Sequence, residues 1–431
     1  MMRTTKPFAL IGLCLFIGSA PVVAQQNTRP ACHPQNAGLT LPAGFCAAIF
    51  ADSVGRARQL VVAPNGDVFV ALSNAGRSGG RGGVLALRDS NGDGVADQRE
   101  RFGENGGNGI ALRGGHLYFA PDDAVLRYPL TAGQLTPSDA PDTIVRGLPG
   151  SPGHAAKTIV LGRGSDLFVN IGSRSNSCQV QDRDNASPGQ DPCTELDQRA
   201  GIWLFDANRT GQSQGDGSRF ATGLRNMVGL TIGPDGQLYG VQHGRDGLAQ
   251  QWGQQFDQSY GAENPAEILV RIERGDDYGW PYCFFATQYS LEIKQQVLAP
   301  EYGGDGKQVG RCAEKKMPLV TYPGHWAPNA LLFYVGRQFP AKYRGGILIA
   351  FHGSWNRAPL PQEGFNVVFQ PITNGGAAGA FEVFADGFAG PGKAEGRATH
   401  RPVGLAMAPD GSLYVTTDVG GRIYRIFYTG R

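Results

Sequence analysis

A strong charge of either sign is missing from this chain. Its 431 residues carry a formal net charge of +2 at pH 7, and the lysines and arginines are dispersed along the sequence. This pattern lacks the basic patch by which proteins hold nucleic acid. The Cys-x-x-Cys-His motif is also absent, which excludes covalently attached c-type haem. We therefore expect a small molecule, and no nucleic acid, as the partner.

Long hydrophobic runs are absent after the N-terminal segment, so the sequence predicts no stable membrane insertion. That segment contains Arg3 and Lys6, an apolar run from Phe8 to Ala20, and small residues that end at Ala24. This is the pattern of a secretory signal, and we expect residues 1–24 to be removed. The mature protein is then periplasmic or secreted. Cys14 leaves a lipoprotein anchor as the alternative.

Six cysteines remain after the expected cleavage, and they fall in three local pairs. The pairs are Cys32 with Cys46, Cys178 with Cys193, and Cys283 with Cys312. An even number of cysteines in an exported protein indicates disulfides. Nearest-neighbour pairing is our expectation for their connectivity.

Helical periodicity is missing as well, whereas 64 glycines and 28 prolines favour many short strands joined by turns. A weak repeat of strand, tight turn and strand recurs at residues 60–70, 110–119, 159–169, 230–240, 339–350 and 405–415. Pairs such as Asn65-Gly66 supply the positive φ that a tight hairpin turn requires. Six hairpins predict an all-β, six-bladed β-propeller over residues 51–431. Residues 25–50 are expected to form a disulfide-tied lead-in.

Residues 89–100 match every position of the calcium-loop pattern D-x-[DN]-x-[DN]-G-x5-E. Oxygen donors at alternate positions and a terminal glutamate suit a hard cation. The predicted ligands are Asp89, Asn91, Asp93, Val95, Asp97 and Glu100. The preceding residues 84–87 are typical of a strand, so we expect the loop on a blade hairpin, with calcium in a structural role. A solvated acidic turn without metal is the alternative.

Histidines and arginines recur at glycine-rich positions between the expected strands, where loops of a rigid scaffold could bring them together. The motifs are Gly153-His154, Gly223-Leu224-Arg225-Asn226, Gln242-His243-Gly244-Arg245-Asp246, Asp277-Tyr278-Gly279-Trp280-Pro281 and His352-Gly353-Ser354-Trp355-Asn356-Arg357. In this order they resemble the soluble sugar dehydrogenases that use pyrroloquinoline quinone (PQQ), most closely the sorbosone dehydrogenase-like branch. The resemblance runs from about Leu60 to the C-terminus and also implies six blades.

The resemblance implies roles for several of these residues. His154 matches the base that takes the proton from the C1 hydroxyl of the sugar while hydride passes to the quinone. An imidazole with an ordinary pKa of ~6.5 suits that task. Arg225 and Asn226 match a cofactor-contacting pair and Arg401 matches a later cofactor arginine, since guanidinium groups bind carboxylates such as those of PQQ. The further cofactor-binding candidates are His325, His352 and Arg357.

The resemblance also implies a calcium ion against the cofactor. Gly244 and Arg245 lie where relatives use backbone carbonyls to hold it, and Glu267 lies where the family has an acidic residue near the cofactor. Such an ion would polarise the quinone carbonyl as a Lewis acid. An alternative metal site would be made by His243, His325 and His352, although no His-x-x-x-His spacing supports it.

These observations predict an exported dehydrogenase that oxidises an aldose or aldehyde sugar at C1 with PQQ and calcium. We expect a small sugar as the substrate and a periplasmic cytochrome or quinone as the electron acceptor. Two alternatives are a calcium-dependent propeller lactonase without a redox cofactor and a non-catalytic propeller that binds carbohydrate or a partner protein. The set of arginines favours the dehydrogenase, because a neutral glycan site has little need for several cations.

Overall fold

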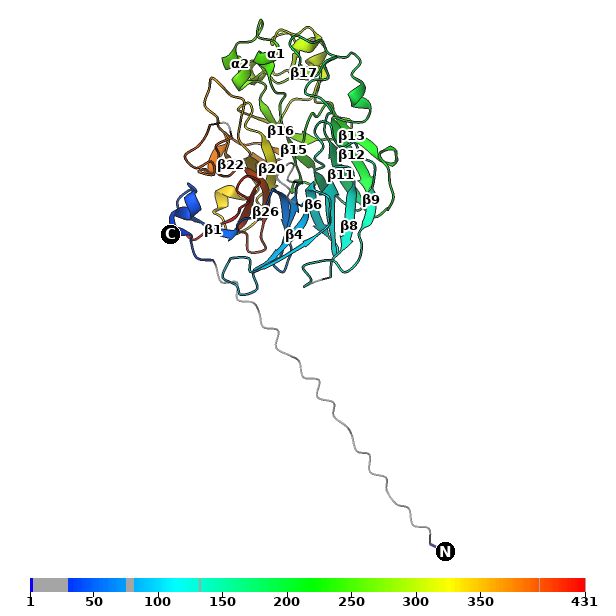
Figure 1. Cartoon of the computed structure of the whole chain (residues 1–431), viewed down its shortest axis with the longest axis vertical. Helices are drawn as coiled ribbons and strands as arrows, with labels where there is room; N and C mark the ends of the chain where they lie inside the picture. The colour runs from blue at the N-terminus through cyan, green and yellow to red at the C-terminus, as the bar shows by residue number, and fades with distance from the viewer. Residues whose placement is uncertain (3–29, 75–80, 132, 395, 431) are drawn as a thin grey trace.

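The computed structural model describes residues 1–2, 30–74, 81–131, 133–394 and 396–430. Within these residues, six four-stranded antiparallel sheets form a β-propeller, which confirms the predicted all-β, six-bladed fold (Figure 1). The predicted signal peptide falls almost entirely on residues outside this description. No helix among the described residues has the length and apolar character needed to cross a membrane.

The first three blades use consecutive strands. Blade 1 contains β2 (Ala57–Val62), β3 (Val68–Leu72), β4 (Gly83–Arg88) and β5 (Gln98–Phe102). Blade 2 contains β6 (Gly107–Arg113), β7 (His116–Pro121), β8 (Val125–Pro129) and β9 (Asp142–Val145). Blade 3 contains β10 (Ile159–Leu161), β11 (Asp166–Ile171), β12 (Gly201–Asp206) and β13 (Ser218–Thr222).

The other three blades carry insertions or borrow a strand. Blade 4 contains β14 (Gly229–Ile232), β15 (Leu238–Gln242), β16 (Glu267–Ile272) and β19 (Val320–Tyr322). Blade 5 contains β20 (Pro328–Phe333), β21 (Ile347–Phe351), β22 (Asn366–Gln370) and β25 (Glu382–Ala385). Blade 6 contains β26 (Pro402–Met407), β27 (Leu413–Thr417), β28 (Ile423–Tyr428) and β1 (Phe45–Ala51).

The first strands of the blades form a closed ring. In order, β2, β6, β10, β14, β20 and β26 each contact the next, and β26 contacts β2. The strand β1 from near the N-terminus pairs with β28 near the C-terminus, so the last blade joins the two ends of the chain. The propeller therefore begins at Phe45, within the stretch that we expected to be a lead-in. Pairing of strands from both ends of the chain in one sheet closes the ring of blades.

The hairpin pattern located five of the six inner hairpins correctly. In blades 1, 2, 3, 4 and 6 the repeat falls on the first two strands. The hairpin predicted at residues 339–350 was wrong, because only the second half of this stretch is a strand, β21. Its first half contains the short 3-10 helix η7 (Ala341–Tyr343). The true partner of β21 is β20, which ends before this connection begins.

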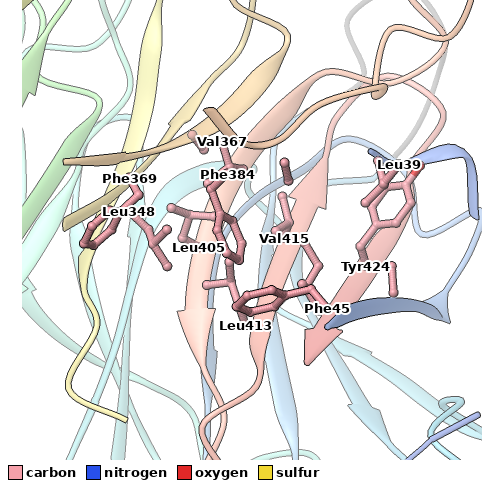
Figure 2. Close-up of a cluster of buried hydrophobic side chains, with 14 of the residues drawn as sticks. Leu39, Phe45, Leu348, Val367, Phe369, Phe384, Leu405, Leu413, Val415 and Tyr424 are labelled. Carbon is pink, nitrogen blue, oxygen red and sulfur yellow. The ribbon is translucent and has the colours of Figure 1, made fainter. Parts of the chain in front are cut away.

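Aromatic and branched side chains fill the space between blades 5 and 6 (Figure 2). The ring of Phe45 on β1 lies edge-on to Phe339 and Phe384, with centroids 4.8 and 5.1 Å apart. Leu348, Leu413 and neighbouring apolar residues complete the cluster. Similar clusters lie between the other adjacent sheets and make the propeller a rigid frame for its loops.

The largest insertion lies between β16 and β19 and packs with the loop before β16. It contains β17 (Cys283–Phe284), β18 (Val297–Leu298) and α3 (Thr287–Ile293). The loop before β16 contributes α1 (Leu248–Gln251) and α2 (Gln258–Glu263), and Figure 1 shows these elements beyond the blades, at the end of the molecule opposite the N-terminus. The other short elements are η1 (Pro34–Gly38), η3 (Thr194–Asp197), η4 (Gln214–Asp216), η5 (Pro300–Tyr302), η6 (Gly310–Glu314), β23 (Ile372–Thr373) and β24 (Gly376–Ala377). All three expected disulfide pairs are confirmed.

The antiparallel order of the strands places the candidate residues on one face of the propeller. Successive strands of a blade are antiparallel, so the start of the first strand, the end of the second and the start of the third share a face. His154, Asn226 and Arg401 directly or closely precede first strands, whereas His352 and Glu267 lie at the end of a second strand and the start of a third. We call this face the site face.

Candidate active site

His154 lies in the loop that leads into β10. The preceding Gly153 has a φ of +102°, and a Cβ added there would lie 2.4 Å from the carbonyl oxygen of Arg174. A Cβ on Gly172 would lie 2.6 Å from the Cβ of His154. Glycine at both positions therefore lets the histidine loop pack directly on the loop that follows β11.

The imidazole of His154 is held against Ser173. Its Nδ1 lies 3.0 Å from the Ser173 carbonyl oxygen and 2.9 Å from the hydroxyl oxygen. Burial, together with the positive charge of Arg225, lowers the pKa of His154 to about 3, and the Ser173 hydrogen bond opposes this only in part. The side chain is therefore neutral near pH 7, which is the state that a proton acceptor requires.

The guanidinium of Arg225 is buried and already bonded to the protein. It donates from Nε to the Asn176 carbonyl at 3.0 Å and from one terminal nitrogen to the Gly244 carbonyl at 2.7 Å. The other terminal nitrogen bonds to the Asn176 side chain and to Asp246, at 2.9 and 3.2 Å. Trp280 donates to the same Asn176 carbonyl at 3.0 Å. Arg225 thus joins the loops after β11 and β15 at the site face.

Asp246 gathers charged and polar side chains around it. Its carboxylate accepts from Arg225, from Arg183 at 3.1 Å and from Asn356 at 3.1 Å. Burial alone would raise the pKa of Asp246, but the two arginines hold it at about 2. Asp246 is therefore an anion paired with two arginines, whereas His154 is neutral.

Asn226 differs from its neighbour. Its side-chain Oδ1 is buried and has no hydrogen-bond partner among the residues that the structure describes. An unpaired buried amide oxygen costs free energy, so this atom fits a ligand that would donate to it or bring an ion or water. Of the two predicted cofactor contacts at this turn, Asn226 has the freer polar atom.

Two of the residues predicted at the calcium site, Glu267 and Gly244, are joined by a hydrogen bond. Glu267, at the start of β16, accepts from the backbone N–H of Gly244 at 2.9 Å and of Ala327 at 3.2 Å. Burial raises the pKa of Glu267 to about 8. The Arg245 side chain turns away into a buried ion pair with Glu301. The Gly244 carbonyl already accepts a hydrogen bond from Arg225, and calcium binding by the Gly244 and Arg245 carbonyls stays a prediction.

His352 and Arg401 lie together near the ring of first strands. The Nε2 of His352 lies 2.8 Å from Asp418, whose other oxygen pairs with Arg58 at 3.3 Å. Arg401 donates from Nε to the His352 carbonyl at 2.9 Å, and its guanidinium lies over the ring of Phe365. Burial lowers the pKa of His352 despite the neighbouring Asp418. This corner holds two arginines for one carboxylate, an excess of positive charge.

The remaining candidates brace the loops. Arg357 donates from one terminal nitrogen to the carbonyls of Ala262 and Gly324, at 3.0 and 2.8 Å. His325 bonds through Nε2 to the Gly261 carbonyl at 2.9 Å, and its Nδ1 lies 3.3 Å from Asn356. The structure thus brings these residues to the site face, but their polar atoms point into the protein.

The hydrogen bonds of the three histidines do not support the alternative metal site. The Nε2 of His243 lies 3.0 Å from the Pro328 carbonyl and 3.0 Å from Asn329. Each of the three histidines therefore bonds to a different protein acceptor through Nε2. In the described ranges, no three His, Cys, Asp or Glu side chains are grouped so that they could hold a metal ion.

Sequence reasoning missed several polar residues at the centre of the ring. Arg58 donates to Asn108 at 3.0 Å, Asn108 donates to Thr158 at 2.9 Å, and Gln59 donates to the Asn329 carbonyl at 2.7 Å. Each lies at or next to the start of a first strand, where apolar residues follow. Alignment of the repeats on their first strands shows a polar residue at this register in four blades, whereas Val228 and Val403 occupy it in blades 4 and 6.

Residues 89–97 connect β4 and β5 on the face opposite the candidate site, and the predicted ligand Glu100 lies within β5, where it pairs with Ala86. Asp89 accepts from the backbone N–H of Gly92 and Gly94, at 2.7 and 2.8 Å, and Asp97 accepts from the Ser90 hydroxyl at 2.7 Å. The loop is therefore closed by its own side chains. Calcium binding at this loop stays a prediction.

Comparison with known proteins identifies the family of this chain. A family model described as TrAA12-like matches residues 39–429. The chain therefore belongs to this family. A PQQ-dependent pyranose dehydrogenase of Coprinopsis cinerea is 26% identical over 310 residues, which cover 63% of this chain and 39% of the relative. An uncharacterised protein of Borreliella burgdorferi is 31% identical over 216 residues, 48% of each chain. The alignments thus span half or less of these relatives.

Solved structures share the fold. The PQQ domain of the Coprinopsis cinerea pyranose dehydrogenase, in its holo form, has a TM-score of 0.71 at 20% identity and covers 90% of this chain and 97% of that one. A calcium structure of a Trichoderma reesei family AA12 enzyme has a TM-score of 0.72 at 19% identity, with coverages of 93% and 99%. A PQQ-bound aldose sugar dehydrogenase of Streptomyces coelicolor scores 0.53 at 17% identity, with coverages of 90% and 99%. The relatives are thus PQQ-dependent sugar dehydrogenases, and the sorbosone dehydrogenase-like branch is not confirmed.

Proposed function

We propose that this protein is an exported, PQQ- and calcium-dependent dehydrogenase that oxidises an aldose sugar at C1. The observation that carries the proposal is His154, a neutral imidazole held on the site face by Ser173 and near the charge of Arg225. Family membership supports the redox class, because the named relatives use PQQ. The finer assignments, including the sugar and the electron acceptor, are proposals.

The residues present fit a flat anionic cofactor over the ring of first strands. Asn226 offers an unpaired buried oxygen. Arg58 pairs with Asp418 and Arg401 bonds to the His352 carbonyl nearby, so two guanidinium groups lie in this corner. When bound there, PQQ would supply the quinone that accepts hydride. The carbonyls of Gly244 and Arg245 are the proposed donors to a calcium ion at its edge.

His154 performs the proton step. The sugar's C1 hydroxyl loses its proton to the neutral imidazole as the C1 hydrogen leaves with its electron pair. The negative charge of Asp246 favours the imidazolium that forms, although the positive charge of Arg225 has the larger, opposing effect on the pKa of His154. Ser173 keeps the ring in place through the contacts to Nδ1.

The test is reconstitution of purified apoprotein. Dye reduction by aldose sugars should appear only after both PQQ and calcium are added. Hydrolysis of sugar lactones by the cofactor-free protein would instead support the lactonase. Sugar binding without either activity would support a non-catalytic propeller.

A further inference from the structure

The loop that follows β11 determines which nitrogen of His154 is free. Ser173 is fully buried, and its carbonyl oxygen lies 2.9 Å from the His154 backbone nitrogen and 3.0 Å from Nδ1. A carbonyl oxygen can only accept a hydrogen bond, so a contact at this distance requires the proton to reside on Nδ1.

The Ser173 hydroxyl gives the same result independently. Its oxygen lies 2.7 Å from the Ser175 carbonyl, to which it must donate its single proton. Toward His154 Nδ1, at 2.9 Å, the hydroxyl can therefore only accept. Both Ser173 oxygens thus select the tautomer that carries hydrogen on Nδ1, and Nε2 keeps the lone pair. Among the described residues, no protein group bonds to that Nε2.

Ser173 is itself fixed from both sides. Its backbone N–H donates to the Arg225 carbonyl at 2.8 Å, which ties it to the turn before β14. On the other side, Glu195 accepts the backbone N–H groups of Arg174 and Ser175, at 2.7 and 3.1 Å. The Cys178–Cys193 disulfide closes the same loop. The acceptors for His154 therefore belong to a braced segment.

We propose that Ser173 is a positioning residue that fixes His154 in the tautomer protonated on Nδ1, so that Nε2 accepts the proton from the sugar. This inference rests on the proposed function for its kinetic consequence, but the tautomer itself does not depend on it. The role differs from simple packing, because a residue that only filled space would leave the proton's position and the turnover unchanged.

The first test is nitrogen NMR of the apoprotein with labelled histidine. The His154 ring should show a protonated Nδ1 and an unprotonated Nε2 at pH 7. In Ser173→Ala the form protonated on Nδ1 should stay the major one, because the backbone carbonyl remains, but a minor fraction protonated on Nε2 should appear because the hydroxyl acceptor is lost. A wild-type ring protonated on Nε2 would overturn the proposal, whatever the activity of the protein.

The second test is the kinetics of the reconstituted enzyme. Ser173→Ala should lower kcat roughly 5- to 10-fold, as expected for loss of one buried hydrogen bond, with the KM for sugar and the PQQ affinity unchanged. Ser412→Ala is the matched control, since Ser412 is equally buried, bonds to Asp410 at 2.7 Å and lies in a turn of the opposite face. Wild-type kcat in Ser173→Ala, or an equal loss in Ser412→Ala, would contradict the proposal. Absence of any PQQ-dependent activity in the wild type would refute the proposed function but leave the NMR result standing.

Discussion

The partly buried imidazole of His154 predicts a specific loss of stability in mild acid. We compare the wild type with His154→Asn, because asparagine retains an amide donor near the position of Nδ1 but does not titrate. The perturbation is a change from pH 7 to pH 5 in the apoprotein, so no cofactor charge contributes.

The magnitude follows from two pKa values. In the unfolded chain the imidazole has its ordinary pKa of 6.5, whereas burial and Arg225 lower the folded pKa to about 3. The unfolded state therefore binds an extra proton between these values, and the free energy of unfolding falls as the pH falls below 6.5, down to about pH 3. At pH 5 the loss from His154 is about 2 kcal/mol, from ~1.4 kcal/mol for each pH unit below the unfolded pKa.

Urea unfolding at both pH values measures this difference. The stability lost between pH 7 and pH 5 should be smaller in His154→Asn than in the wild type by about 2 kcal/mol. His33→Asn, at an exposed position, controls for the general effect of removing a histidine. Equal losses in the two proteins, or a His154 ring signal that titrates near pH 6.5, would refute the burial argument.

Three further predictions concern the proposed enzyme. His154→Ala should retain PQQ, as seen in the absorption spectrum, but lose on the order of 10²–10⁴-fold in turnover; near wild-type turnover would remove it from the mechanism. Arg225→Ala should lower the unfolding free energy by roughly 3–5 kcal/mol, because it leaves Asp246 without its buried partner. Arg401→Ala should mainly weaken PQQ binding in a titration. Loss of stability in Arg401→Ala and loss of PQQ binding in Arg225→Ala would contradict this assignment of roles. Asp93→Ala should lower the melting temperature only when calcium is present; a wild type whose melting ignores chelator would make the loop an acidic turn.

The blades were largely predictable because their inner hairpins use short turns with local signals. Asn65-Gly66 and Asp235-Gly236 both place glycine at positive φ, with values of 93° and 79°. The first hairpin of blade 5 lacks such a short turn, because a longer connection that contains η7 joins its first two strands. The origin of the last strand of blade 6 also had no local signal, since β1 pairs with β28 across almost the whole chain.

The sequence indicated that loops could bring the candidate residues together, but it did not predict their contacts. Loop motifs identified the face on which His154 and Asn226 lie. The sequence did not reveal that Arg225 bonds to the backbone and side chain of Asn176, because that partner comes from another blade and belongs to no motif. Arg58 was missed for a similar reason, since its partner Asp418 follows β27, 360 residues later.

Reconstitution tests the central claim most directly. Apoprotein freed of PQQ and calcium is assayed for dye reduction with aldose sugars, before and after each is added alone and together. Sugar-dependent reduction is expected only with both present, and it should be lost in His154→Ala. Sugar oxidation by exhaustively PQQ-free protein, or no oxidation of any aldose by protein whose spectrum shows bound PQQ, would contradict it.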